Sequence, residues 1–223
     1  MALLIFLSAP LVLSVSFLLL HSFLAHFASP RARRSKLEHL TVCAETITYL
    51  IYPFFWQHIY IPILPRQLID YVCAPMPFVM GVETSYLPDE LLLEGVVLVD
   101  LQANELRVYD QEQVAPLPEA ALSRLSKELR KLVDDPKVPL RADQTVPDAK
   151  LKKCFLGFFT RLFKNYQKFL EAPDDAVTEK FQKENFAADL NLRGDPFMAQ
   201  FLNAQLFQCF VDERFEQSQV RLR

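Results

Sequence analysis

The stretch LIYPFFWQHIYIPILP at residues 50–65 decides the fold. Pro53 must end any helix that precedes it, because proline lacks a backbone donor and clashes with the turn before it. Ile59-Tyr60-Ile61 is a short β-branched and aromatic run closed by a proline, which is typical of a strand. Pro65 stands where proline favours the first turn of a helix, here over Gln67–Cys73. The stretch therefore predicts a helix end, a strand and a second helix in succession.

Apolar residues on both sides of this stretch extend the pattern. Upstream, they recur at helical spacing from Leu37 to Ile51 and predict an amphipathic helix that ends at Tyr52. Downstream, Phe78–Val82 and Val96–Val99 are continuous apolar runs, which indicate strands buried on both faces, as in a mostly parallel sheet. A turn at Asn104 then predicts a hairpin with the run 106–109.

The remainder of the chain has helical patterns. One apolar stripe at helical spacing consists of Leu122, Leu125, Leu129 and Leu132. The segment 136–147 that follows is polar and contains prolines, which predicts a linker. Aromatic residues cover more than half of the helix expected over 154–170, which must therefore be buried on two sides. Asp195 and Pro196 predict the start of a last helix that continues to Phe215.

The N-terminal segment Ala2–Ala28 contains no Asp, Glu, Lys or Arg and is long enough to cross a bilayer as a helix. A basic cluster at residues 31–36 follows it, whereas a secretory signal carries its charge before the apolar run. Three interpretations remain open: a reverse-oriented membrane anchor, a buried core helix, or an aberrant start without a stable role. If the segment is an anchor or a core helix, we expect it to form one continuous helix. If it is an anchor, the rest of the chain faces the cytosol.

Composition excludes several classes of function. The net charge of -3 gives no basic field for a nucleic-acid partner. The four cysteines lie far apart among apolar neighbours, so we expect them to be reduced core residues: Cys43, Cys73, Cys154 and Cys209. No histidine stands at zinc-ligand spacing from any of them, so we expect no metal site. No pattern indicates a cofactor or a small-molecule substrate.

The segment Leu50–Pro65 and its continuation LIDYVCAPMPFVMGV at residues 68–82 together resemble the central segment of DENN domains. Four motifs occur together over more than thirty positions: Tyr-Pro, Trp-Gln-His, Ile-Pro-Ile-Leu-Pro and Ala-Pro-Met-Pro. The sequence around Asp70 is most similar to that of the connecdenn group. Phe155–Leu170 and the motif LFQCFVDER at 206–214 resemble helices of the C-terminal DENN lobe. The resemblance covers about residues 36–216 and leaves no room for the family's N-terminal longin-like lobe.

The resemblance implies an α/β fold: a mostly parallel three-layer central DENN lobe packed on an all-helical C-terminal DENN lobe. The N-terminal apolar helix, expected from composition and outside the resemblance, is added to these lobes. The expected division is an apolar helix with a basic flank at 1–36, a central lobe at 37–135, a linker at 136–147 and a helical lobe at 148–223. The implied function is binding of a small Rab-family GTPase as a guanine-nucleotide exchange factor in vesicle and endosomal trafficking. The implied location is cytoplasmic, peripheral to or anchored on endosomal or vesicle membranes.

Nucleotide exchange breaks no covalent bond, so the chain needs no catalytic residue and is not expected to be an enzyme in that sense. Instead, five residues are candidates for partner contact: Trp56, Gln57, His58, Asp70 and Tyr71. Trp56 and His58 also suit a structural role, and Asp70 and Tyr71 also suit the end of a helix. The alternative function is a truncated DENN fragment without exchange activity, which serves as a membrane-tethered interaction protein.

Overall fold

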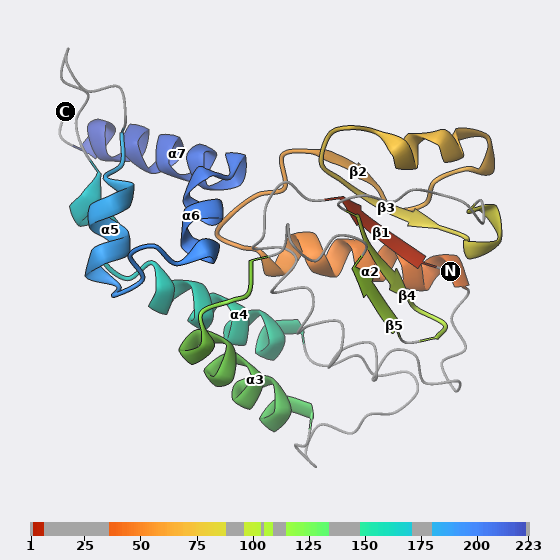
Figure 1. Cartoon of the computed structure of the whole chain (residues 1–223), viewed down its shortest axis with the longest axis horizontal. Helices are drawn as coiled ribbons and strands as arrows, with labels where there is room; N and C mark the ends of the chain where they lie inside the picture. The colour runs from red at the N-terminus through yellow and green to blue at the C-terminus, as the bar shows by residue number, and fades with distance from the viewer. Residues whose placement is uncertain are drawn as a thin grey trace.

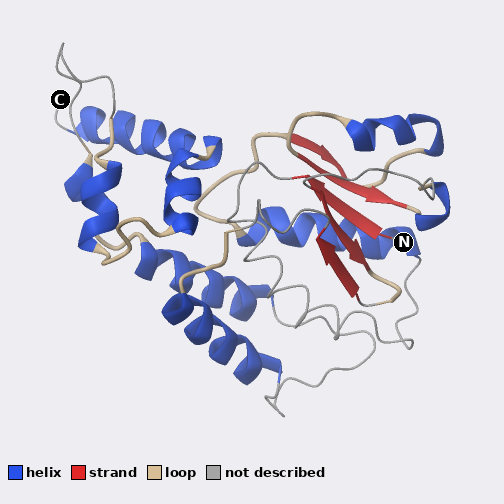
Figure 2. Cartoon of the chain, viewed as in Figure 1, coloured by secondary structure: helices blue, strands red, loops and turns tan. Residues whose placement is uncertain are grey.

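The computed structural model describes residues 2–6, 36–87, 96–103, 105–108, 115–133, 148–170 and 180–221. The strands are β1 (Ala2–Phe6), β2 (Ile59–Ile61), β3 (Phe78–Val82), β4 (Val96–Asp100) and β5 (Glu105–Val108). The α-helices are α2 (Lys36–Leu50), α3 (Glu119–Val133), α4 (Asp148–Leu162), α5 (Lys183–Asp189), α6 (Pro196–Asn203) and α7 (Gln205–Arg221). The 3-10 helices are η1 (Arg66–Cys73), η2 (Thr84–Tyr86) and η3 (Tyr166–Phe169). The strands gather in one half of the molecule, and α3 to α7 gather in the other (Figure 2).

The five strands form one sheet in the order β2-β3-β1-β4-β5. As predicted, β2 and β3 are parallel neighbours joined by a helical crossover, which is η1. β4 and β5 form the predicted hairpin, where the Asp100 carboxylate accepts hydrogen bonds from the backbone N–H groups of Gln102 and Ala103. β4 is not a neighbour of β3, however, because β1 lies between them.

The prediction of a mostly parallel sheet is wrong for the strand pairing. β1 pairs antiparallel with both β3 and β4, and β4 pairs antiparallel with β5, so only the β2–β3 pair is parallel. β2, β3 and β4 nevertheless all run in one direction. The central strand β1, red in Figure 1, reverses the direction between β3 and β4 and so makes the sheet mixed.

The predicted N-terminal helix is also wrong at its start, because Ala2–Phe6 is the central strand of the sheet. A short apolar run has no periodicity that distinguishes a buried strand from a buried helix, and here neighbouring strands on both sides satisfy its backbone. The rest of the predicted helix, residues 7–28, lies outside the described residues. Within the described ranges, no helix has the length and apolar character needed to span a membrane.

Alternate residues of the strands pack on opposite faces of the sheet. Val79, Val97 and Val99 pack with residues of α2, which runs along one face (Figure 1). Phe78, Met80, Val82, Val96 and Leu98 pack on the other face with Leu64 and with Val72 of η1. This alternation follows from the two-residue period of a strand and explains why the apolar runs are continuous. The finer expectation of a three-layer lobe stays a prediction.

The helices α3 and α4 lie side by side, and both contribute to the core that also includes α2 (Figure 1). α4 ends at Leu162, whereas the pattern predicted one helix to residue 170. The turn that follows allows Phe163 and Phe169 to pack on the same ring, that of Phe186, with centroids 5.8 and 5.5 Å away. The predicted last helix is likewise two helices, which separate at the extended residue Ala204.

Phe54 joins the central segment to the helical half. Its side chain is 1% exposed, and its ring centroid lies 5.0 to 5.4 Å from four phenylalanine rings of that half. These rings belong to Phe159, Phe163, Phe201 and Phe210. The predicted division into lobes stays a prediction, and its linker at 136–147 lies outside the described residues. The described core nevertheless continues across the proposed boundary.

Candidate functional site

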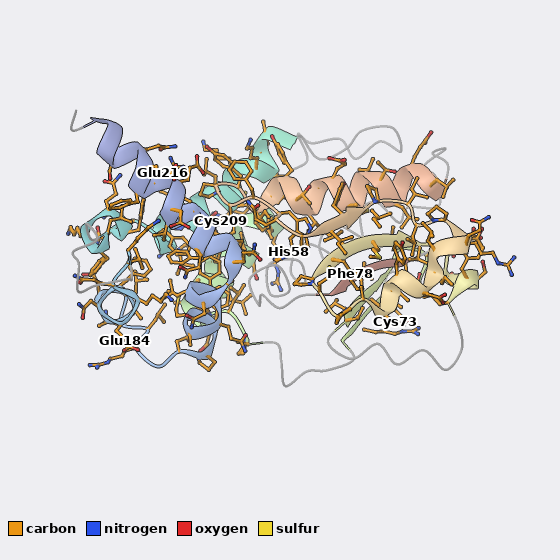
Figure 3. The ribbon with its side chains drawn as sticks, turned by 90° about the horizontal axis from the view of Figure 1, so that it is seen from above. His58, Cys73, Phe78, Glu184, Cys209 and Glu216 are labelled. Atoms are coloured by element: carbon orange, nitrogen blue, oxygen red, sulfur yellow. The ribbon has the colours of Figure 1, made fainter. Side chains whose placement is uncertain are left out.

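Trp56, Gln57 and His58 form the link between buried Phe54 and strand β2. The Trp56 indole Nε1 donates a hydrogen bond to the carbonyl oxygen of Ile59 at 3.0 Å and so holds the start of β2. The rings of Trp56 and His58 pack edge to face with centroids 5.2 Å apart. Gln57 between them is exposed. His58 lies where the helical half meets the sheet half (Figure 3).

A groove of about 420 Å³ opens beside this link. Its lining comes from the last turns of α2, from the link and from α4, and includes Tyr49, Tyr52, Phe55, Trp56, His58 and Lys152. Three of these are unusually exposed for large aromatic residues: Tyr49 at 45%, Tyr52 at 41% and Phe55 at 56%. The groove therefore presents aromatic surface to solvent at the junction of the two halves. We name it the aromatic groove.

Two ionisable groups in the lining have shifted pKa values. Burial lowers the pKa of His58, so its imidazole is favoured in the neutral form. Burial raises the pKa of Tyr60, and the nearby Glu45 carboxylate raises it further. The buried Tyr60 hydroxyl nevertheless lacks hydrogen-bond geometry to any partner in the described part of the chain.

Asp70 and Tyr71 lie on η1, and both side chains are exposed. Asp70 makes no side-chain hydrogen bond or ion pair with the residues that the structure describes, so it does not act as a cap for η1 there. The helix ends instead with the backbone N–H of Ala74, which donates to the carbonyl oxygen of Tyr71. The observed geometry gives the capping interpretation of Asp70 no support.

Exposed apolar side chains lie on the same segment of the chain as this carboxylate. Tyr71 and Met76 are each 51% exposed, Ile63 is 42% exposed and Leu68 is 39% exposed. Large apolar residues that gather on one exposed segment are a common property of interaction sites. We name Ile63, Leu68, Asp70, Tyr71 and Met76 the η1 surface. It combines apolar area with one negative charge.

The structure does not bring the five candidate residues into one site. Asp70 and Tyr71 belong to the η1 surface, whereas Trp56 and His58 line the aromatic groove. In Figure 3, Cys73, the last residue of η1, lies on the sheet half and His58 lies at the junction. The sequence pattern missed the groove because Lys152 is about a hundred positions from Tyr49 and Tyr52. No local signal connects these residues.

The described residues include no group of histidine, cysteine, aspartate and glutamate side chains that could hold a metal ion. The four cysteines are free thiols, and burial raises the pKa of Cys43 to about 12. Its sulfur thus stays protonated and behaves as a small core residue. Cys73 differs from the expectation of a core position, because it is exposed.

Comparison with known proteins identifies the family. The sequence model of the DENN (AEX-3) domain matches residues 32–104, which include α2, the link, β2, η1, β3 and β4. Relatives more than 30% identical over four-fifths of the chain extend this match, so the chain belongs to the DENN domain family. The resemblance found in the sequence is thereby confirmed.

The DENN relatives extend the match over most of the chain. DENN domain-containing protein 1A of Xenopus laevis is 31% identical over 186 residues, which are 82% of this chain and 17% of the relative. DENN domain-containing protein 1B of Homo sapiens is 33% identical over 183 residues, 81% of this chain and 22% of the relative. These two names confirm the similarity to the connecdenn group. DENN domain-containing protein 2C of Homo sapiens is 31% identical over 190 residues, 81% of this chain and 20% of the relative.

The chain thus spans about a fifth of the length of the curated relatives that it matches. DENN proteins are known as modules that act on Rab GTPases. Their role as regulators of GTPases agrees with a non-catalytic protein, since regulation of this kind needs a shaped surface and no nucleophile.

Proposed function

We propose that this chain binds a Rab-family GTPase through the η1 surface and promotes release of its guanine nucleotide. The observation that carries the proposal is an exposed carboxylate without a partner in the described chain, together with exposed apolar side chains on the same segment, which the DENN model matches. Burial of the exposed apolar area supplies binding free energy, and the single charge of Asp70 helps to orient the partner protein.

Exchange requires only differential binding. A Rab holds its nucleotide through the phosphate-binding loop and Mg²⁺, and its switch segments can order or disorder. A partner that binds the nucleotide-free form more tightly weakens nucleotide affinity by the same factor. Contacts of the η1 surface with a switch segment produce this effect to the extent that they are stronger in the nucleotide-free form, and we expect exchange to be slow because holding a switch segment open needs contacts on both of its sides.

A binding measurement tests the η1 surface. The full chain is titrated into a panel of nucleotide-free and GDP-bound Rab proteins, and release of a fluorescent GDP analogue is followed in parallel. Asp70→Ala and Tyr71→Ala are each expected to weaken binding to the nucleotide-free Rab by about tenfold or more, because interface centres depend on a few residues. Glu184→Ala, which removes an exposed carboxylate from α5, is the matched control and is expected to bind as the parent does.

Three outcomes are informative. Weaker binding of both variants, with thermal stability unchanged, supports the η1 surface. A large loss of stability in Asp70→Ala marks a structural role and contradicts the proposal. Rab binding without nucleotide release supports the alternative function, a DENN fragment that engages partners without exchanging nucleotide.

We also propose that the protein is cytoplasmic and binds endosomal or vesicle membranes peripherally. The support is the basic cluster 31–36, which suits an anionic headgroup surface. A membrane anchor before this cluster is not proposed, because β1 and α2 pack in one folded unit and so lie on the same side of a bilayer. Sedimentation of the full chain with vesicles that contain anionic lipid tests this proposal, and equal recovery with neutral vesicles contradicts it.

A further inference from the structure

We propose that the aromatic groove is a second binding site, which takes the guanidinium group of an arginine in a segment of a partner protein. The site is separate from the η1 surface and does not depend on Rab binding. Its lining combines exposed aromatic faces, one carboxylate and a buried hydroxyl without a partner among the described residues. These groups together attract a planar cation that can donate several hydrogen bonds.

The aromatic rings of the groove already bind a cation within the chain. The Lys152 ammonium lies 4.2 Å from the ring centroid of Tyr49 and 5.0 Å from that of Tyr52. Both distances are within the range of attractive cation–π contacts. Because both tyrosines and Phe55 remain more than two-fifths exposed, aromatic area is still available to a second cation.

The carboxylate in the groove lining accepts hydrogen bonds and does not donate them, so it favours an occupant that carries hydrogen-bond donors. Glu45 is exposed on α2, and its carboxylate lies near enough to the Tyr60 hydroxyl to raise the pKa of that group. The Tyr60 hydroxyl beside it is buried without hydrogen-bond geometry to a described partner, and its oxygen can accept a hydrogen bond from an added donor. The neutral state favoured for His58 places no additional positive charge in the groove.

Arginine fits this arrangement better than lysine. A guanidinium is planar, carries five N–H donors and is weakly hydrated, so it can stack on an aromatic ring and bond a carboxylate at the same time. An ammonium is compact, and Lys152 already occupies the ammonium position on the two tyrosine rings. The groove is also large enough to hold a guanidinium group, since its volume is about 420 Å³.

The chain provides its own reporter of binding. Trp56 is the single tryptophan of the protein and lines the groove, so the indole N–H gives one signal in a ¹H–¹⁵N correlation spectrum. The probe is the peptide acetyl-Gly-Arg-Gly-amide, titrated into the full chain. The comparison peptide contains citrulline, which has nearly the same shape without the charge. We expect a saturating shift of the indole signal with the arginine peptide and none with the citrulline peptide.

Two pairs of variants distinguish the groups that bind the guanidinium. Glu45→Gln is expected to weaken binding by about fivefold or more, because it replaces a charge-assisted hydrogen bond with a neutral one. Its control is Glu184→Gln on α5, which is expected to bind as the parent does. Lys152→Gln is expected to tighten binding, since it removes the cation that occupies the tyrosine rings. Its control is Lys153→Gln, an exposed neighbour outside the groove lining.

Each contrary result overturns the proposal. Equal shifts with both peptides show that charge is not recognised, and the absence of any shift shows that the groove does not bind arginine. Unchanged or weaker binding in Lys152→Gln contradicts competition for the tyrosine rings. All four substitutions replace polar side chains at least partly accessible to solvent, and circular dichroism of each variant verifies the fold before titration.

Discussion

Gly81 shows at the residue scale how closely the sheet packs on the turn that follows β2. A Cβ atom at this position would lie 1.9 Å from the carbonyl oxygen of Pro62, which is backbone and cannot move aside. We expect Gly81→Ala to lower the free energy of unfolding by about 1 to 3 kcal/mol, measured by urea denaturation. Gly157→Ala in α4 is the control, because its Cβ would meet only the flexible Arg161 guanidinium at 3.3 Å. That variant should be as stable as the parent or about 1 kcal/mol more stable.

His58 makes a second prediction at this scale. Its pKa is lowered by burial from an ordinary value of 6.5, so the unfolded chain takes up a proton at higher pH than the folded chain. The contribution of His58 to stability is therefore complete above pH 6.5 and declines as the pH falls toward the lowered pKa. We expect His58→Gln to lose less stability than the parent between pH 7.5 and pH 5.5, as measured by urea midpoints. An equal loss in both proteins would show that other groups account for the pH dependence.

At the scale of elements, Phe54 connects the segment before β2 to the helices α4, α6 and α7. Its ring contacts rings from all three helices, including the more distant Phe207 at 6.5 Å. We expect Phe54→Ala to reduce the free energy of unfolding by about 3 to 5 kcal/mol, because a cavity would open where these helices meet. Phe55→Ala is the matched control: the neighbouring side chain is 56% exposed, and its loss should change stability by about 0.5 kcal/mol or less. Similar losses in both variants would contradict the central position of Phe54.

Local signals in the sequence were sufficient to predict most elements of the sheet half. Proline positions and periodicity located α2, β2, η1 and β3. In the helical half, the predicted start of α6 is confirmed, because the Asp195 carboxylate accepts a hydrogen bond from the backbone N–H of Met198. The breaks after Leu162 and at Ala204 were missed, because neither occurs at a glycine or proline. They depend on phenylalanine rings that pack only in the folded state. The same limit applies to the aromatic groove, whose lysine and tyrosines come from distant parts of the chain.

At the scale of the whole molecule, β1 holds the two sides of the sheet together. A shortened chain that starts at Leu37 would lack this strand, so β3 and β4 would lose their common neighbour. We expect Leu4→Pro to abolish cooperative unfolding of the full chain, because proline removes a backbone donor from a strand paired on both sides. Leu4→Val retains the donor and should unfold cooperatively. Circular dichroism during urea titration measures both, and unchanged unfolding of Leu4→Pro would exclude β1 from the sheet.

The position of β1 also has a consequence for biosynthesis. Ala2 pairs with Asp100, so the ribosome must add about a hundred further residues before this strand has partners on both sides. At roughly 5 to 20 residues per second, this interval lasts on the order of 5 to 20 seconds. Throughout that time the nascent chain carries an apolar segment whose backbone groups lack their native partners. Translation speed and chaperone supply should therefore influence the yield of this protein more than that of a domain built from sequential hairpins.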